Sequence, residues 1–157
     1  MRDMMGRLKL TVNERKTKLC RVPAETFDFL GYTFGRCYSK KTGRAYIGSR
    51  PSKTKIRKLC DSVSEMTSQR TLNREPAEVI QRLNRRLVGW SGYFRLGPVS
   101  PAYRAVVRHV ADRLRRWLCR KHKDRSLGFT RFSNDRLEQL GLVRLWRRTR
   151  DLPWAKA

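Results

Sequence analysis

PAEVIQRLNRRLVGWSGYFRLGPVSPAYRAVVRHVADRLRRWLCRKHK, residues 76–123, predicts two long amphipathic helices joined by a short turn. Apolar residues recur at spacings of three and four on both sides of Gly97-Pro98, which places them on one stripe of each helix. Pro76 suits the first turn of the first helix, and Ser100 ahead of Pro101 is the expected N-cap of the second. Because Gly97-Pro98 ends the first helix, the two stripes should pack as an antiparallel pair. The expected core positions are Ile80, Leu83, Leu87, Trp90, Phe94, Tyr103, Val107, Val110, Leu114, Trp117 and Leu118.

The opposite sides of these two helices are rich in arginine. A solvated helix exterior usually mixes charges of both signs, whereas carboxylates are scarce in this stretch. We therefore interpret the outer surface as one that binds a polyanion, with an ordinary solvated exterior as the alternative. The arginines of this surface are Arg82, Arg85, Arg86, Arg104, Arg108, Arg115, Arg116 and Arg120.

The whole sequence is strongly basic, with 38 Lys and Arg against 13 Asp and Glu and a formal net charge of +25. A folded protein tolerates such self-repulsion best when a polyanion neutralises it, so nucleic acid is the default partner. The length of 157 residues fits one domain or a domain with an appendage, and a hydrophobic content of 39% is enough for a core. No membrane partner is expected, because the sequence has no long uncharged run and its aromatic residues fall at core spacing.

The cysteines predict a reducing, intracellular environment. The four of them are far apart, with no Cys-x-x-Cys pair and no secretory signal, so we expect a reduced, intracellular protein that is not secreted. Cys119 and His122 have the spacing of half a zinc site, but no second half accompanies them, so no metal site is expected. His109 and His122 are the only histidines, and neither accompanies a recognisable nucleophile or group of carboxylates.

Residues 26–50 have the pattern of a small antiparallel β element. Residues 26–34 alternate aromatic and β-branched side chains around Gly31, which predicts one strand with a bend or a close backbone approach at that glycine. Residues 36–50 predict a hairpin with its turn at 41–43. The returning strand of this hairpin is expected at 45–48.

A third helix is expected between this β element and the helix pair. Pro51-Ser52 caps it, and its apolar positions Ile56, Leu59, Cys60, Val63 and Met66 fit helical spacing. A short helix beginning after Ser133 and ending at Gly141 follows the pair. The expected fold is therefore α+β: a small N-terminal antiparallel β element, then a mainly α-helical three-helix bundle and a short C-terminal helical extension.

Three stretches carry a resemblance to a known family. LTVNERKTK (10–18), FDFLGYTF (27–34) and LNRRLVGWSGYF (83–94) resemble, in order and spacing, the last part of a group II intron reverse transcriptase and maturase. The resemblance implies that residues 1–50 are the end of the palm and that 51–123 are the thumb, also called the maturase or X domain. Residues 124–157 would then be a basic C-terminal extension.

Within those segments, the resemblance assigns roles to particular residues. Phe29, Leu30, Gly31 and Tyr32 are similar to the primer grip of the palm. Lys16 is similar to a lysine that follows the catalytic motif in many polymerases and lies near the incoming nucleotide.

The departures from the family bear on catalysis. Polymerisation by the family uses a Tyr-Ala-Asp-Asp type motif whose aspartates hold two metal ions. The sequence has no such motif, since Asp3, Asp28 and Asp61 are isolated, and it has no His-Asn-His nuclease with cysteine pairs. We therefore expect no catalytic residues, no copying of RNA by this chain alone and no cofactor of its own. Mg²⁺ would belong to the absent palm site or to the intron RNA.

The expected function is to grip structured intron RNA, and a template–primer duplex in a full enzyme, in support of splicing. Guanidinium groups bind phosphate oxygens at two points and stack on bases, which suits this task. Trp90, Tyr93, Phe94 and Trp117 could stack on bases, but their helical spacing favours packing. The residues expected to contact phosphate are Lys53, Lys55, Arg82, Arg85, Arg86, Arg104, Arg108 and Arg115.

Two other interpretations stay open. The chain could be one piece of a split or truncated reverse transcriptase, in which case a separate palm and fingers chain would be a partner. It could also be a repurposed subunit of a ribonucleoprotein assembly, in which an exposed edge of the β element pairs with another chain. DNA and an RNA–DNA duplex are further candidate partners.

Overall fold

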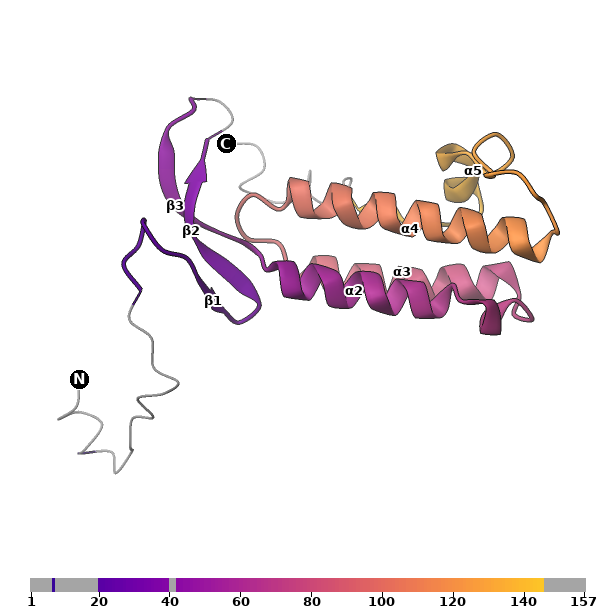
Figure 1. Ribbon diagram of the computed structural model, residues 1–157, viewed down its shortest axis with the longest axis horizontal. Helices are drawn as coiled ribbons and strands as arrows, with labels where there is room; N and C mark the ends of the chain where they lie inside the picture. The colour runs from indigo at the N-terminus through magenta and orange to yellow at the C-terminus, as the bar shows by residue number, and fades with distance from the viewer. Residues whose placement is uncertain (1–6, 8–19, 40–41, 146–157) are drawn as a thin grey trace.

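The computed structural model describes residues 7, 20–39 and 42–145, which form a small antiparallel sheet followed by a bundle of helices. Figure 1 shows the sheet at one end of the long axis and the helices extending away from it. The expected α+β class is confirmed. Residues 10–18, with Lys16, and the basic end of the chain at 146–157 lie outside the described residues.

The sheet has three strands in the order β1-β2-β3, namely β1 (Phe27–Phe29), β2 (Tyr32–Tyr38) and β3 (Ala45–Pro51). The prediction of a single strand over 26–34 was wrong, because the chain reverses at Leu30 and Gly31. Both residues have positive φ, 49° and 82°, as in the two-residue turns that match the twist of a hairpin. The second hairpin is confirmed, and its returning strand runs on to Pro51, which pairs with Tyr32.

Three helices form the bundle: α2 (Lys53–Met66), α3 (Pro76–Tyr93) and α4 (Ser100–Lys121). Helix α3 runs antiparallel to α2 and α4, so the expected antiparallel pair is confirmed (Figure 1). The side chain of Ser52 caps α2 by accepting a hydrogen bond from the backbone N–H of Lys55. Ser100 is the first residue of α4 rather than its N-cap, a position that Val99 takes without a side-chain bond.

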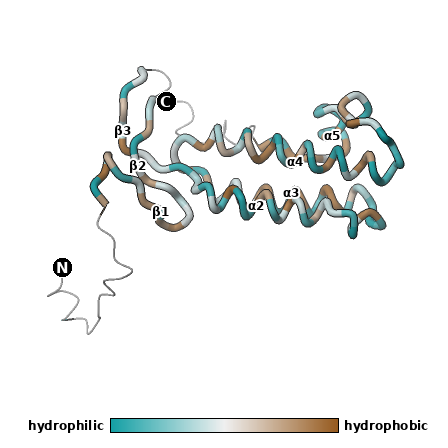
Figure 2. The backbone as a smooth tube through the Cα atoms, viewed as in Figure 1, coloured by the Kyte–Doolittle hydropathy of each residue, from teal (hydrophilic) through white to brown (hydrophobic). Residues whose placement is uncertain are grey.

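The core lies between the three helices. Figure 2 shows hydrophobic and hydrophilic residues alternating along α2 and α4, as amphipathic helices require. Most of the predicted core positions of α3 and α4 are buried, with Leu83 and Leu114 fully enclosed. Val107 is an exception, since it is only half-buried while its neighbour Val106 is fully enclosed. Trp90 is also half-buried and packs against the edge of the core.

The segment after α4 returns to the bundle and adds to its core. A short 3₁₀ helix, η1 (Gln69–Thr71), connects α2 to α3, and α5 (Asn134–Gln139) follows α4 with Ser133 as its N-cap, as predicted. Phe132, Leu137 and Leu145 are buried in the same hydrophobic core as the three long helices. The division of the chain at 50 and 123 stays a prediction, but residues 124–145 pack as part of the bundle.

Candidate nucleic-acid interface

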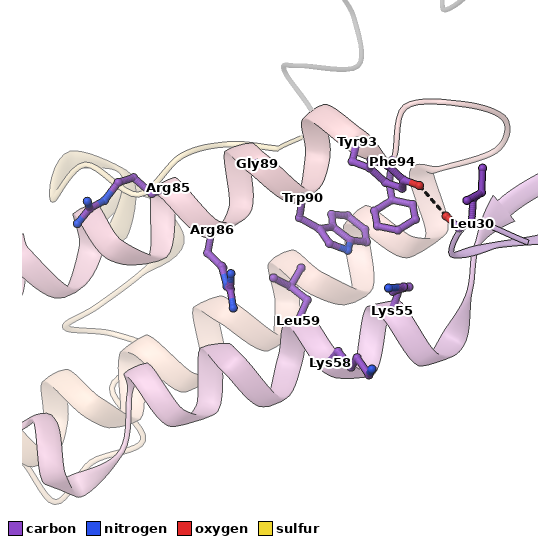
Figure 3. A pocket seen from close by; sticks show the side chains of 10 residues that line it. All are labelled: Leu30, Lys55, Lys58, Leu59, Arg85, Arg86, Gly89, Trp90, Tyr93 and Phe94. Atoms are coloured by element: carbon purple, nitrogen blue, oxygen red, sulfur yellow. Dashed lines mark hydrogen bonds between the residues drawn. The ribbon is translucent and has the colours of Figure 1, made fainter.

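A groove of about 500 Å³ opens where α2 and α3 meet the turn between β1 and β2. Figure 3 shows side chains of both helices and of the turn around it. The groove residues share helical spacing, three or four apart on α2 and again on α3, so each helix presents one face to the groove. They are Leu30, Lys55, Lys58, Leu59, Arg85, Arg86, Gly89, Trp90, Tyr93 and Phe94.

The charge of this groove is entirely positive. Lys55 and Lys58 come from α2, Arg85 and Arg86 come from α3, and the lining contains no carboxylate. Arg86 reaches from α3 towards α2 (Figure 3), and its Nε donates a hydrogen bond to the Ser62 hydroxyl at 3.2 Å. Four cationic residues that line one groove without a carboxylate create a strongly positive potential, which favours an anionic ligand such as phosphate.

Aromatic side chains form the sheet end of the groove. Tyr93 is 55% exposed, yet the orientation of its ring is fixed because its hydroxyl donates a hydrogen bond to the Leu30 carbonyl at 2.7 Å. Phe94 is buried against Tyr32, with ring centroids 5.1 Å apart. The Nε1 of Trp90 is buried and has no hydrogen-bond partner in the described part of the chain.

The predicted primer-grip residues form the β1–β2 turn beside this groove. Leu30 lines the groove and is 68% exposed, whereas Tyr32 is buried and donates a hydrogen bond to the Tyr93 carbonyl at 2.7 Å. The Gly31 carbonyl accepts a hydrogen bond from the Ser52 amide at 2.9 Å. Phe29 is 56% exposed on β1. The turn is therefore bound to the N-terminus of α2 and to the C-terminus of α3, which fixes its position relative to the basic side chains.

The structure brings together only some of the predicted phosphate contacts. Lys55, Arg85 and Arg86 line the same groove, while Lys53 lines a second groove between the sheet and the start of α4. Arg82 lies 3.8 Å from Glu78, one turn earlier on α3. Arg104 and Arg108 are exposed one turn apart on α4. The outer basic surface is thus divided into several patches.

The expected placement of Arg115 on the outer surface was wrong. Its side chain is buried, and its Nε donates a hydrogen bond to the Phe132 carbonyl at 2.8 Å. The other guanidinium nitrogens bind Asp112 and Asn134. The physical reason is that residues 124–145 return across α4 and offer oxygen acceptors to this arginine, which a helical pattern alone does not reveal.

Two further basic residues of α4 also point inward. Arg113 donates to the carbonyls of Ser64 and Thr67, and burial together with the nearby Arg120 and Arg116 lowers its pKa. Lys121 donates to the carbonyls of Leu72 and Arg74.

Sequence reasoning missed Lys58 and Gly89 as parts of the groove. A signal for both was available: Lys58 lies three residues after Lys55, and Gly89 lies three residues after Arg86 and four before Tyr93. Helical neighbours at these spacings share a face. The fact that these two faces meet in one groove depends on how α2 packs against α3, which the spacing does not define.

No group of three or more residues suited to hold a metal ion occurs among residues 7, 20–39 and 42–145. Over the same residues, no helix combines the length and the low polarity needed to cross a membrane.

Burial raises the pKa of the Cys60 thiol, with a smaller contribution from Asp61, and it also raises the pKa of the Cys119 thiol.

Comparison with known proteins agrees with the resemblance drawn from the sequence. A family model described as "Group II intron, maturase-specific domain" matches residues 56–134, which is half of the chain. The match covers most of α2, all of α3 and α4, and the connection to α5. A search of curated proteins found no match.

Proposed function

The chain belongs to the group II intron maturase family, and from that premise we propose that it binds structured intron RNA through the groove between α2 and α3. A maturase-type domain implies a role in group II intron splicing. The single observation that carries the proposal is the groove itself, which is lined by four cationic residues and an exposed tyrosine of fixed orientation, with no carboxylate in its lining. We place this activity in a bacterial cytoplasm or an organelle.

The physical basis is that folded RNA is recognised mainly through phosphates, 2′-hydroxyl groups and shape. Helices fixed to one another present cations at constant separations, so they can distinguish a folded phosphate arrangement from a flexible chain. Lys53, Arg82, Arg104 and Arg108 lie in patches outside the groove and would contact phosphates elsewhere on the folded RNA. DNA and an RNA–DNA duplex would be weaker ligands on this proposal, because their grooves and backbones differ from those of the folded intron.

The test is the affinity of the purified chain for a folded group II intron RNA across a salt series, with duplex DNA and unstructured RNA as competitors. Six or more phosphate contacts predict a slope of about −4 to −5 or steeper in a plot of log affinity against log salt. A preference for the folded intron that persists at moderate salt is expected. Equal binding to every polyanion at all salt concentrations would refute the proposal.

Variants locate the contact on the protein. Lys58→Ala with Arg86→Ala removes one cation from each side of the groove and should lower the magnitude of the slope by about two. The matched control is Arg57→Ala with Arg70→Ala, which removes the same charge from two exposed residues that do not line the groove. A control that weakens binding as much as the groove variant would show that net charge alone is responsible.

A second candidate function rests on the sheet. Phe29, Tyr38 and Ile47 are 56%, 61% and 63% exposed, one on each strand, which is an unusual apolar content for so small a sheet. This favours the alternative in which the β element pairs with a separate palm chain or another subunit of an assembly. Co-expression with a chain that carries the missing aspartates, followed by measurement of the mass of the purified complex, tests it.

A further inference from the structure

We propose that the groove between α2 and α3 receives one unpaired nucleotide of the RNA. The base stacks on the Tyr93 ring, the flanking phosphates lie between the lysines and the arginines, and an acceptor atom of the nucleotide accepts a hydrogen bond from Trp90 Nε1. The inference rests on the proposed function and deepens it, since it names the part of the RNA that the groove recognises. A single unpaired nucleotide is distinct from the duplex segments that a basic surface contacts through phosphates alone.

The first argument is the exposed ring of Tyr93. An aromatic side chain that is 55% exposed normally rotates, but the Tyr93 hydroxyl is bonded to the Leu30 carbonyl and the Tyr93 carbonyl is bonded to the Tyr32 hydroxyl. Leu30 lies next to it and is 68% exposed, so together they form a fixed apolar shelf at one end of the groove (Figure 3). Bases stack on such rings without regard to sequence, because every base has a π-face.

The second argument is the unsatisfied N–H of Trp90. An indole N–H can only donate a hydrogen bond, and a buried donor without an acceptor costs about as much as a lost hydrogen bond. In Figure 3 the nitrogen lies on the side of the ring that faces α2, buried beneath the open surface of the groove that Trp90 lines. A ligand that presents an acceptor at this depth would remove the penalty. Phosphate oxygens, base carbonyls and 2′-hydroxyl groups are all suitable acceptors.

The third argument is the order of these groups along α3. Arg86 precedes Tyr93 by seven residues, two helical turns, so they are separated by about 10 Å along the helix axis. On α3 the arginines therefore lie towards one end of the groove and the aromatic residues towards the other, while Lys55 of α2 lies beside Phe94 and Gly31 at the aromatic end. A nucleotide stacked at the aromatic end would thus have a cation close to its phosphate. The groove volume of about 500 Å³ lies within the range of small-ligand sites.

Gly89 leaves space in the groove that a side chain would otherwise occupy. It lies between the arginines and the aromatic residues, and a Cβ added there would meet no atom within 4 Å. A larger side chain at this position would extend into the groove without disturbing the packing of α3. Gly92 has the same free space around its Cα but does not line the groove, which makes it a matched control.

The experiment compares two RNA hairpins that differ only in a single bulged 2-aminopurine, present in one and absent from the fully paired other, with both affinities measured at each salt concentration of a series. We expect the full chain to bind the bulged hairpin about tenfold more tightly, in line with stacking of one base on an aromatic ring, and to quench the 2-aminopurine fluorescence. Gly89→Gln should abolish both the preference and the quenching, while Gly92→Gln should retain them. Trp90→Phe keeps an aromatic ring, removes the N–H and should reduce the preference several-fold.

The outcomes separate the two proposals. Equal affinity for both hairpins, with a steep salt dependence and preference for the folded intron, would overturn the nucleotide site and leave RNA binding intact. A Gly89→Gln protein that still prefers and quenches the bulged hairpin would also overturn it. Salt-insensitive binding to both hairpins would overturn RNA binding through the groove, and the nucleotide site with it.

Discussion

Replacement of Arg115 by leucine should destabilise the fold without changing the contact with RNA. Leucine fills much of the space of the arginine methylenes, so the change mainly removes the hydrogen bonds of the guanidinium. The buried Phe132 carbonyl would lose the donor that now lies 2.8 Å away, at a cost of about 1–3 kcal/mol. The guanidinium carbon also lies over the Phe129 ring, 4.7 Å from its centroid, and loss of this cation–π interaction adds about 0.5–1 kcal/mol.

Water can replace part of the remaining interactions. Asp112 is 38% exposed, so its carboxylate would be solvated once the arginine is removed. The total expected loss is therefore about 3 kcal/mol in the free energy of unfolding, which for a chain of this length lowers Tm by roughly 6–12 °C. The assay is urea unfolding together with a thermal melt, and limited proteolysis should show earlier cleavage within residues 124–145.

The matched control is Arg104→Leu, on the exposed side of the same helix. This variant should change stability by less than about 0.5 kcal/mol, and it should lower the magnitude of the salt slope for RNA if Arg104 contacts a phosphate. An Arg115→Leu protein as stable as the wild type, with a reduced salt slope, would refute the structural role of Arg115. It would then favour the placement on the outer surface that the sequence predicted.

Two other predictions concern the turn before α4 and the loop after it. Gly97→Ala should lower the free energy of unfolding by about 2 kcal/mol or more, because Gly97 has a φ of 75° and an added Cβ would collide with the Ser49 carbonyl oxygen. The control is Gly43→Ala, where φ is 67° but the space is open, and it should cost about 1 kcal/mol when both variants are measured by urea unfolding. Hydrogen bonds from Ser126, and then the Arg131 ion pair, lower the pKa of Asp124, so its contribution to stability is present above the ordinary carboxyl pKa and is lost as the pH falls through the folded-state value. The unfolding midpoint of Asp124→Asn should therefore depend less on pH below about pH 4 than that of the wild type, and identical acid limbs would show that the carboxylate contributes nothing.

The sequence predicted the helices well because their signals are local. The N-caps at Ser52 and Ser133 and the proline at the start of α3 each act within one turn, so no tertiary information is needed to place them. The hairpin at Leu30 and Gly31 was missed for the opposite reason. Phe29 and Tyr32 face each other across the turn, so the aromatic pattern continues through it, and Leu30 in a positive-φ position is not a recognised turn signal.

The candidate site was only partly predictable. Sequence spacing placed Arg85 and Arg86 on the side of α3 opposite its apolar stripe, and both line the groove, but spacing could not show that Lys55 and Lys58 of α2 line the same groove. That juxtaposition depends on the packing of α2 against α3 through buried residues such as Leu59 and Leu83. Nor could the spacing distinguish an arginine that faces solvent from one that faces a returning segment, which is how Arg115 was misplaced.

The inward arginines and lysine have a common cause, which affects how the RNA surface should be mapped. The last carbonyls of a helix lack partners within the helix, and a chain with few carboxylates has few anionic acceptors to offer its cations. Arg113 therefore donates hydrogen bonds to the backbone carbonyls of Ser64 and Thr67 at the C-terminal end of α2, where positive charge also interacts favourably with the helix dipole. Lys121 likewise donates hydrogen bonds to the Leu72 and Arg74 carbonyls in the connection between α2 and α3. A scan that neutralised every basic residue of α4 would thus unfold the bundle and remove RNA binding for the wrong reason, whereas substitutions limited to its exposed residues and to the groove test the interface itself.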